Sequence, residues 1–345
     1  MSSGEETRKI QFTGKSTYII SLPKQWITDL GLKQGDQVLV GRKGISSLHV
    51  TPYNTRKKDQ TETATIEIEP KEETSTVVRK LVSLYFLHFK TITIKPRVGR
   101  ITPSQRIGIR DAVKKILMGT EITADSSDGI TVQILINLVE LSVDAAFKRM
   151  MLLAKSMLDD ALIAIKEGNV ELAKEVINSD DDVDRFGLYI IRQLRFSLEN
   201  DNSLGLMNSV DKIDCLGYRM IAKSLERIAD HASDMGQQVM SLNKPLPKSI
   251  LAQLDEFSEF SRGNLEKSMR ALVNKDYKLA DKVVTTCLEA PKKELKILNS
   301  DFRMTKDQDA CVVSILEHIR RVSDYSADIG EVVLNLTIDE NLKKQ

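Results

Sequence analysis

From Leu138 almost to its end, the chain has the pattern of long helices, and this region limits the possible folds most. Apolar residues recur at spacings of three and four, while glycine and proline stand mostly at joints. This spacing places the apolar residues along one face of each helix. Helices are predicted over residues 138–167, 170–200, 209–242, 247–273, 276–299 and 307–336. Long helices joined by short loops predict helical bundles, in which each apolar face is buried against a neighbour.

The helical region contains an internal duplication. Residues 161–177 align with residues 268–284, and residues 225–239 align with residues 319–333. The second pair reads LERIADHASDMGQQV against IRRVSDYSADIGEVV. The sequence therefore predicts two copies of a three-helix unit, the first over residues 138–242 and the second over residues 247–338.

Two acidic strips lie in the first copy. Glu226, Asp230 and Asp234 recur at every fourth residue and so share one face of a helix. Asp180 and Asp184 have the same spacing in the preceding helix. If these helices pack side by side, the two rows of carboxylates face each other. Such an arrangement suits hard cations, which prefer oxygen ligands.

Two other interpretations of the acidic strips remain open from the sequence. The acids of the later strip could form a solvated face. The earlier strip could instead belong to a capping box, in which Ser179 and Asp182 begin a helix and acids occupy its first turn. The helical pattern of residues 173–177 immediately before it argues against this second interpretation.

The second copy keeps only part of the acidic pattern. Asp324 and Asp328 align with Asp230 and Asp234 and are candidate ligands, but Arg320 stands in the place of Glu226. The positions aligned with Asp180, Asp182 and Asp184 hold Cys287, Glu289 and Pro291. Because Arg320 and its neighbour Arg321 could neutralise the remaining acids, we expect one good metal site and one degraded site.

Two smaller domains are predicted before the helices. Residues 1–54 hold short strands around a helix at 24–30, which Pro23 opens and Gly31 ends. This segment is too small for a large core and is expected to need a partner. After a polar linker, residues 61–137 follow the order β-α-β-α-β-β, which predicts a small α+β domain with helices on one face of a sheet.

Charge and residue usage restrict the function classes. Residues 1–59 carry ten basic and five acidic side chains, whereas residues 138–345 carry a net charge of −6. The three cysteines form no CxxC pair, which fits a reducing cytoplasm. No signal peptide and no membrane insertion are expected, because the N-terminus has no apolar segment and no apolar run reaches 18 residues. A P-loop and a Ser/His/Asp set are absent from the sequence, so no enzyme is expected.

The histidines are predicted to be structural. His231 follows Asp230 directly and points about 100° away from it on a helix, so it is expected to pack beside the acidic strip. His49, His88 and His318 are isolated in the sequence.

The N-terminal segment resembles the AbrB/SpoVT looped-hinge DNA-binding family. The resemblance is carried by Gly14-Lys15-Ser16, by ISLPK over residues 20–24 and by LGLKQGDQV over residues 30–38. It implies a homodimer in which two chains interlock their hairpins into one small swapped-hairpin β-barrel, with a basic face on operator DNA. Residues at or near the basic contact positions are Arg8, Lys9, Lys15 and Lys24. Ile27 and Thr28 stand where the family commonly has arginine, and a role in dimerisation alone remains open.

The helical region resembles the PhoU family of phosphate-uptake regulators. LAKEVINSDDDVD and LERIADHASDM carry the resemblance, which spans about 200 residues and both copies. It implies an all-α pair of three-helix bundles that binds metal clusters, with Asp180, Asp184, Glu226, Asp230 and Asp234 lining the first site. Iron, manganese, zinc or magnesium is the expected ion. The implied partners are a phosphate ABC transporter or its regulatory kinase, and the fusion of the two families resembles an archaeal arrangement.

The sequence thus predicts a cytoplasmic regulator of phosphate uptake and homeostasis. In it, metal-binding helical bundles are coupled to a dimerising, DNA-binding head. The alternative is an AbrB-type transcription factor whose bundles serve only oligomerisation.

Overall fold

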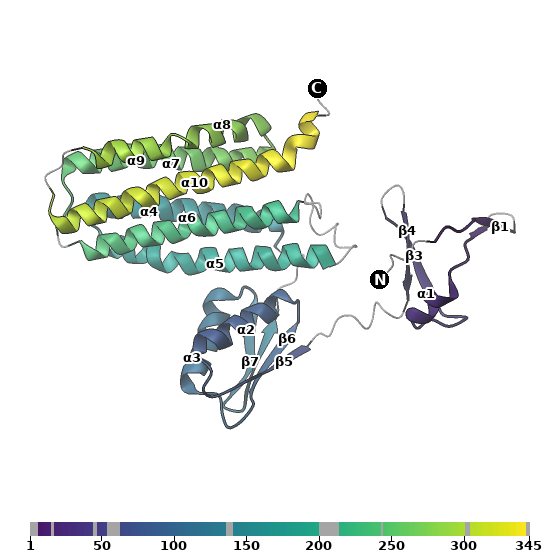
Figure 1. Ribbon diagram of the computed structural model, residues 1–345. Coiled ribbons are helices and arrows are strands. Elements are labelled where there is room, and N and C mark those ends of the chain that lie inside the picture. Colours follow the sequence, from purple (N-terminus) through teal and green to yellow (C-terminus); the bar gives the residue numbers. More distant parts are fainter. Residues whose placement is uncertain are drawn as a thin grey trace. The chain divides into compact units, whose positions relative to one another are not determined.

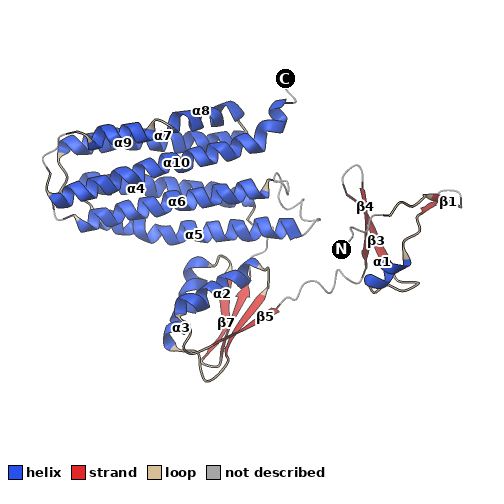
Figure 2. Cartoon of the chain, viewed as in Figure 1, coloured by secondary structure: helices blue, strands red, loops and turns tan. Residues whose placement is uncertain are grey.

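The computed structural model describes residues 6–14, 17–43, 47–53, 63–135, 141–199, 214–242, 244–300 and 304–342. The chain divides into two compact units, Met1–Glu62 and Thr63–Gln345 (Figure 1). The first unit contains two short hairpins and one helix, and the second contains a four-stranded sheet with its helices and a set of long helices (Figure 2). Lys15 and the predicted linker at 55–60 lie outside the described residues.

The first unit has the predicted order of strands and helix. β1 (Gln11–Thr13) pairs antiparallel with β2 (Thr17–Ile19), and β3 (Val38–Lys43) pairs antiparallel with β4 (Ser47–Pro52). Between the hairpins, α1 (Lys24–Asp29) begins after Pro23. Gly31 follows the helix with φ of 65°, a left-handed conformation that glycine adopts without strain.

The described residues of this unit form no apolar core within one chain. Among its described residues, only Pro23 and Pro52 are buried. The exposed apolar side chains include Phe12, Tyr18, Ile19, Val38, Val40, Leu48 and Val50. Such a concentration of exposed apolar side chains is typical of a surface that another molecule covers.

The second unit opens with the predicted β-α-β-α-β-β domain. Its elements are β5 (Thr63–Ile68), α2 (Thr74–Phe86), β6 (Thr91–Pro96), α3 (Pro103–Asp111), the π-helical turn η2 (Ala112–Ile116), β7 (Thr120–Ser126) and β8 (Gly129–Ile134). The strand order is β5-β6-β8-β7, with β5 and β6 parallel and the other neighbours antiparallel. The predicted element order is confirmed.

The sheet domain contacts the long helices directly. Tyr85 of α2 is fully buried, and its hydroxyl donates a hydrogen bond to the Met118 carbonyl at 3.1 Å. The Arg192 guanidinium donates to the Tyr85 carbonyl and lies 4.5 Å from the centre of its ring. Arg192 belongs to α5, so this contact joins the sheet domain to the helical region.

The helical region contains α4 (Val143–Glu167), α5 (Val170–Glu199), α6 (Cys215–Ser241), α7 (Lys248–Asn274), α8 (Tyr277–Cys287), α9 (Ala290–Leu298) and α10 (Lys306–Leu342). The predicted start of the first helix near residue 138 lies outside the described residues, and α4 begins at Val143, where Ser142 caps it by accepting a hydrogen bond from the Ala145 amide at 3.2 Å. Within the described residues, no helix combines the length and apolar character needed to cross a membrane.

The predicted continuous helix at 276–299 is wrong. Helix α8 ends at Cys287, Leu288 and Glu289 form a turn, and α9 begins at Ala290 with Pro291 in its first turn. Proline lacks an amide proton and fits the first turn of a helix, but not its interior. The second repeat therefore replaces one long helix by two short ones.

The two repeats share a close helix contact. A Cβ on Gly236 of α6 would lie 3.0 Å from the Ala173 carbonyl oxygen of α5. At the aligned positions, a Cβ on Gly330 of α10 would lie 3.2 Å from the Ala280 carbonyl oxygen of α8. Glycine thus allows the last helix of each repeat to approach the second helix closely, which supports the predicted duplication.

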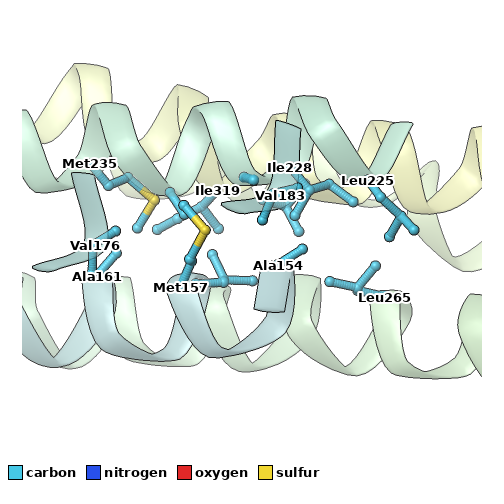
Figure 3. Close-up of a cluster of buried hydrophobic side chains, with 14 of the residues drawn as sticks. Ala154, Met157, Ala161, Val176, Val183, Leu225, Ile228, Met235, Leu265 and Ile319 are labelled. Carbon is cyan, nitrogen blue, oxygen red and sulfur yellow. The ribbon is translucent and has the colours of Figure 1, made fainter. Parts of the chain in front are cut away.

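The apolar faces of the helices form one continuous core. In Figure 3, Val183 of α5, Ile228 of α6 and Ile319 of α10 point into this core, and all three are essentially buried. The core includes residues of both repeats, since α6 packs against α10 and α4 packs against α7. The helices that carry the acidic strips are therefore held in fixed positions by packing on their opposite faces.

Candidate metal centre

The earlier acidic strip lies in the interior of a helix. Because α5 runs from Val170 to Glu199, Ser179 cannot cap its start. The Ser179 hydroxyl instead donates to the Glu175 carbonyl at 2.9 Å, as serine does within a helix. The capping-box interpretation is therefore wrong.

Carboxylates of α5 and α6 influence one another across their packed helices. Burial, followed by the charge of Asp230, raises the pKa of Asp180 to about 6. Burial, followed by the charge of Glu226, raises the pKa of Asp184 to about 7. The pKa of Asp230 is raised as well, by burial and then by Glu226. These raised pKa values indicate that neighbouring negative charges oppose one another, and we call the group the acidic cluster, formed by Asp180, Asp184, Glu226, Asp230 and Asp234.

The cluster is only partly neutralised by the protein. The Lys223 ammonium pairs with Glu226, and Lys115 of the sheet domain lies 3.6 Å from Asp181 beside the cluster. Asp180 Oδ1 is buried and has no hydrogen-bond partner in the described part of the chain. A buried oxygen without a donor is costly, and a cation would satisfy it. The donor set, which consists of carboxylate oxygens, fits a hard cation.

A second group of possible ligands includes histidine. Among the described residues, His231 and Asp234 of α6 and His318 of α10 form a set in which one ligand atom from each residue lies within 4.8 Å of the others. His231 Nδ1 and His318 Nδ1 are 2.9 Å apart. In the described part of the chain, no three carboxylates of the acidic cluster meet this distance criterion together.

The sequence did not predict this histidine group. His231 was expected to pack beside the acidic strip, yet it shares a helix face with Asp234, three residues later, and that spacing was a usable signal. No local signal could have identified His318, because it comes from another repeat, 87 residues further along the chain.

The second repeat neutralises its acids with arginine. Arg320 Nε lies 2.7 Å from Glu294 of α9, and another nitrogen of Arg320 lies 2.6 Å from Asp324. Arg321 lies 3.7 Å from the same aspartate. Cys287, at the position of Asp180, is buried, and burial with the nearby Asp324 raises its thiol pKa to about 12. Arginine therefore neutralises acids of the second repeat within the fold, and the degraded second metal site stays a prediction.

Removal of the Arg320 charge is expected to destabilise the fold. Arg320→Gln leaves two half-buried carboxylates without their shared cation, so the free energy of unfolding in urea should fall by about 1–3 kcal/mol. Arg321→Gln is the matched control, because its contacts are longer and its side chain is 43% exposed. It should change stability by less than about 0.5 kcal/mol. Equal effects of the two substitutions would contradict the assigned role of Arg320.

The described basic residues proposed to contact DNA are solvent-exposed. Arg8 pairs with Glu6, and Lys9 and Lys24 lie on the surface of the first unit. Exposed positive charges of this kind are suited to phosphate contacts but are also common on protein surfaces.

Comparisons with known proteins agree with both resemblances. Residues 147–239 match the PhoU domain, and residues 11–58 match the family of the bacterial antitoxin MazE, described as antidote-toxin recognition. A phosphate-specific transport system accessory protein PhoU homolog from Aquifex aeolicus is 27% identical over 137 residues. That match spans 39% of this chain and 60% of the relative.

A second relative covers more of the chain. The phosphate-specific transport system accessory protein PhoU homolog from Borreliella burgdorferi is 26% identical over 210 residues, which span 54% of this chain and 87% of the relative. The crystal structure of PhoU from Pseudomonas aeruginosa superposes with a TM-score of 0.51 at 17% identity, covering 57% of this chain and 96% of that one.

The structural likeness extends to the fold of the long helices, and the sequence matches cover both the helical region and the N-terminal unit. The chain therefore carries a PhoU domain in its helical region and a MazE/AbrB-like domain at its N-terminus.

Proposed function

We propose that the chain regulates phosphate uptake and that a metal ion between α5 and α6 takes part in this regulation. The acidic cluster carries the proposal, since Asp180 and Asp184 are half-buried opposite the acids of α6 and have raised pKa values. The names of the relatives, accessory proteins of phosphate-specific transport, support the biological role. In this proposal the protein is a cytoplasmic regulator and has no catalytic activity.

The proposed ligands are Asp180, Asp184, Glu226, Asp230 and Asp234. Magnesium, manganese, iron and zinc all bind carboxylate oxygens. Magnesium and manganese have the stronger preference for oxygen ligands. Because the ion must displace protons from Asp180 and Asp184, its affinity should decrease as the pH falls below about 7. Asp324 and Asp328 of the second repeat are weaker candidates, since Arg320 already pairs with Asp324.

Metal binding would act by removing repulsion between two packed helices. With their carboxylates neutralised, α5 and α6 can approach more closely or hold one register. The same α5 contacts the sheet domain through Arg192 and Tyr85 and through Asp181 and Lys115. A change in α5 would therefore alter the sheet domain, and with it the surface offered to a phosphate transporter or its regulatory kinase.

The N-terminal unit would dimerise the protein. We propose that two copies cover their exposed apolar side chains by forming the swapped-hairpin barrel of the AbrB type. Arg8, Lys9, Lys15 and Lys24 would then face operator DNA. The proposed domains are residues 1–54, 61–137, 138–242 and 247–338.

A paired substitution tests the role of the acidic cluster. Glu226→Gln combined with Asp230→Asn should remove the metal of the acidic cluster, measured as a fall in metal content by elemental analysis of the purified protein, and lower the affinity of that cluster by more than about 100-fold. In cells that lack the native gene, the variant should fail to restrain uptake of labelled phosphate at high external phosphate. Glu171→Gln combined with Glu175→Gln is the control, because it removes two exposed acids at the same spacing on α5.

Two results would contradict the proposal. A metal content equal to that of the wild type in the first variant would exclude the acidic cluster as the site. Loss of metal with normal control of phosphate uptake would separate the site from regulation and favour the alternative, a DNA-binding protein whose bundles only oligomerise.

A further inference from the structure

We propose that His231, Asp234 and His318 form a separate site for one transition-metal ion of the zinc type, which links the last helices of the two repeats. The histidine site shares Asp234 with the acidic cluster, but the two sites join different pairs of helices and differ in their chemistry. The acidic cluster lies between α5 and α6 of one repeat and offers only oxygen. The histidine site lies between α6 and α10 and offers two imidazoles and one carboxylate.

The distances are close to those that a metal requires. Zinc binds histidine nitrogen at about 2.0–2.1 Å, so two ligands in a tetrahedral site lie about 3.3 Å apart. His231 Nδ1 and His318 Nδ1 are 2.9 Å apart. One ligand nitrogen of each histidine and one carboxylate oxygen of Asp234 all lie within 4.8 Å of one another. Small rotations of these side chains would therefore bring all three ligands to metal distance, and water would provide a fourth.

The helix geometry supports the site. His231 and Asp234 are three residues apart on α6 and so lie on one face. Pairs of acidic and histidine residues with this spacing are used as metal ligands in other helical bundles. His318 reaches them from α10, which packs along α6. Ligands from two packed helices give a preformed site, with little backbone left to order.

The surroundings hold both rings in orientations suited to ligation. His318 Nε2 lies 3.2 Å from the Ser314 hydroxyl, which can fix this nitrogen as the protonated one and leave the lone pair on Nδ1. The His231 ring stacks on Tyr325, with ring centres 5.7 Å apart. Burial lowers the pKa of both imidazoles, that of His231 to about 4, so both are neutral near pH 7, as ligation requires.

In the metal-free form, the two Nδ1 atoms share one proton in a hydrogen bond. When His318 carries its proton on Nε2, His231 Nδ1 must be the donor. On metal binding, His231 would move its proton to Nε2, and each Nδ1 would offer a lone pair to the ion. The hydrogen bond between the helices would be replaced by two metal bonds.

The duplicated positions do not form a second site of this kind. In the repeat alignment, Tyr325 takes the place of His231, Ser224 takes the place of His318, and only Asp328 is retained as an aspartate. The residues that align with the two histidine ligands therefore provide no imidazole. One ion per chain is expected, and it would cross-link the two repeats in a way that the acidic cluster does not.

Cobalt(II) distinguishes the two sites, because four-coordinate cobalt with nitrogen ligands absorbs visible light strongly and six-coordinate cobalt with oxygen ligands absorbs weakly. The full-length chain titrated with Co²⁺ should develop an intense band that saturates at one ion per chain, and Zn²⁺ should abolish it. His318→Gln should lose the band and weaken binding by more than about 100-fold. His49→Gln removes an exposed histidine of β4 and should retain the band.

The acidic-cluster variant keeps this test separate from the proposed function. Glu226→Gln with Asp230→Asn should leave the intense band unchanged, even if it abolishes phosphate regulation. Persistence of the band in His318→Gln would overturn the proposal. X-ray absorption of the zinc-loaded wild-type chain provides a test without mutation, in which two imidazole ligands are expected. Fewer than two imidazoles would also overturn the proposal, whether or not His318→Gln folds.

Discussion

Replacement of Val40 by aspartate is expected to convert the full-length protein from dimers to monomers. Val40 lies opposite Val50 in the β3–β4 hairpin, and the same face carries Leu48. These side chains are 65%, 39% and 72% exposed in one chain. If a second copy covers this face, a carboxylate at position 40 would be buried without a partner, which costs several kcal/mol. Sedimentation equilibrium at micromolar concentration measures the change.

Thr51→Asp is the matched control for this experiment. Thr51 lies on the same hairpin, opposite Leu39, and points to the other face. Thr51→Asp adds the same charge to the same hairpin and should leave the dimer intact. Dissociation by both substitutions would indicate general disruption of the hairpin, and a dimer that survives Val40→Asp would exclude this face as the interface.

The second large effect is a gain in stability on removing one carboxylate from the acidic cluster. In the metal-free protein at pH 8, Asp184→Asn should raise the free energy of unfolding by about 1–2 kcal/mol. The pKa of Asp184 is about 7 in the fold and about 4 in an unfolded chain. A tenfold difference in proton affinity between the two states corresponds to about 1.4 kcal/mol, and partial exposure to water reduces the effect.

The direction of the pH dependence follows from the raised pKa. The folded state binds this proton more tightly than the unfolded state, so metal-free stability should decrease as the pH rises from about 4 to about 7. Asp184→Asn should flatten that decrease, and added metal should stabilise the wild type more than the variant. Urea denaturation in the presence of a chelator, repeated across this pH range, measures both.

Asp182→Asn is the control, because Asp182 is exposed on the same helix. The free energy of unfolding of Asp182→Asn should depend on pH in the same way as that of the wild type. If Asp184→Asn destabilises the metal-free protein at pH 8, the carboxylate forms a favourable contact in the fold, and repulsion within the cluster is not the dominant effect.

Local sequence patterns were sufficient to predict most of the helices and the order of elements in the sheet domain. Apolar spacing depends only on neighbouring residues, so it predicted α5, α7 and the elements of the sheet domain to within a few residues. The repeat alignment pairs Gly236 with Gly330, and the structure shows that each of these glycines meets an aligned alanine carbonyl. The four-residue spacing also identified the acidic residues, because spacing on one helix face is a local property.

Which helix faces meet depends instead on the packing of the whole chain. Periodicity shows which side of α6 is polar, but it does not show that part of this side lies against α10. The pairing of His231 with His318 therefore depends on packing between the repeats. For the same reason, the sequence predicted that Arg320 could neutralise Asp324 but gave no indication that Arg320 also pairs with Glu294. Glu294 belongs to α9, the short helix that has Pro291 in its first turn. Contacts between distant residues depend on how whole helices pack, and no local pattern encodes that arrangement.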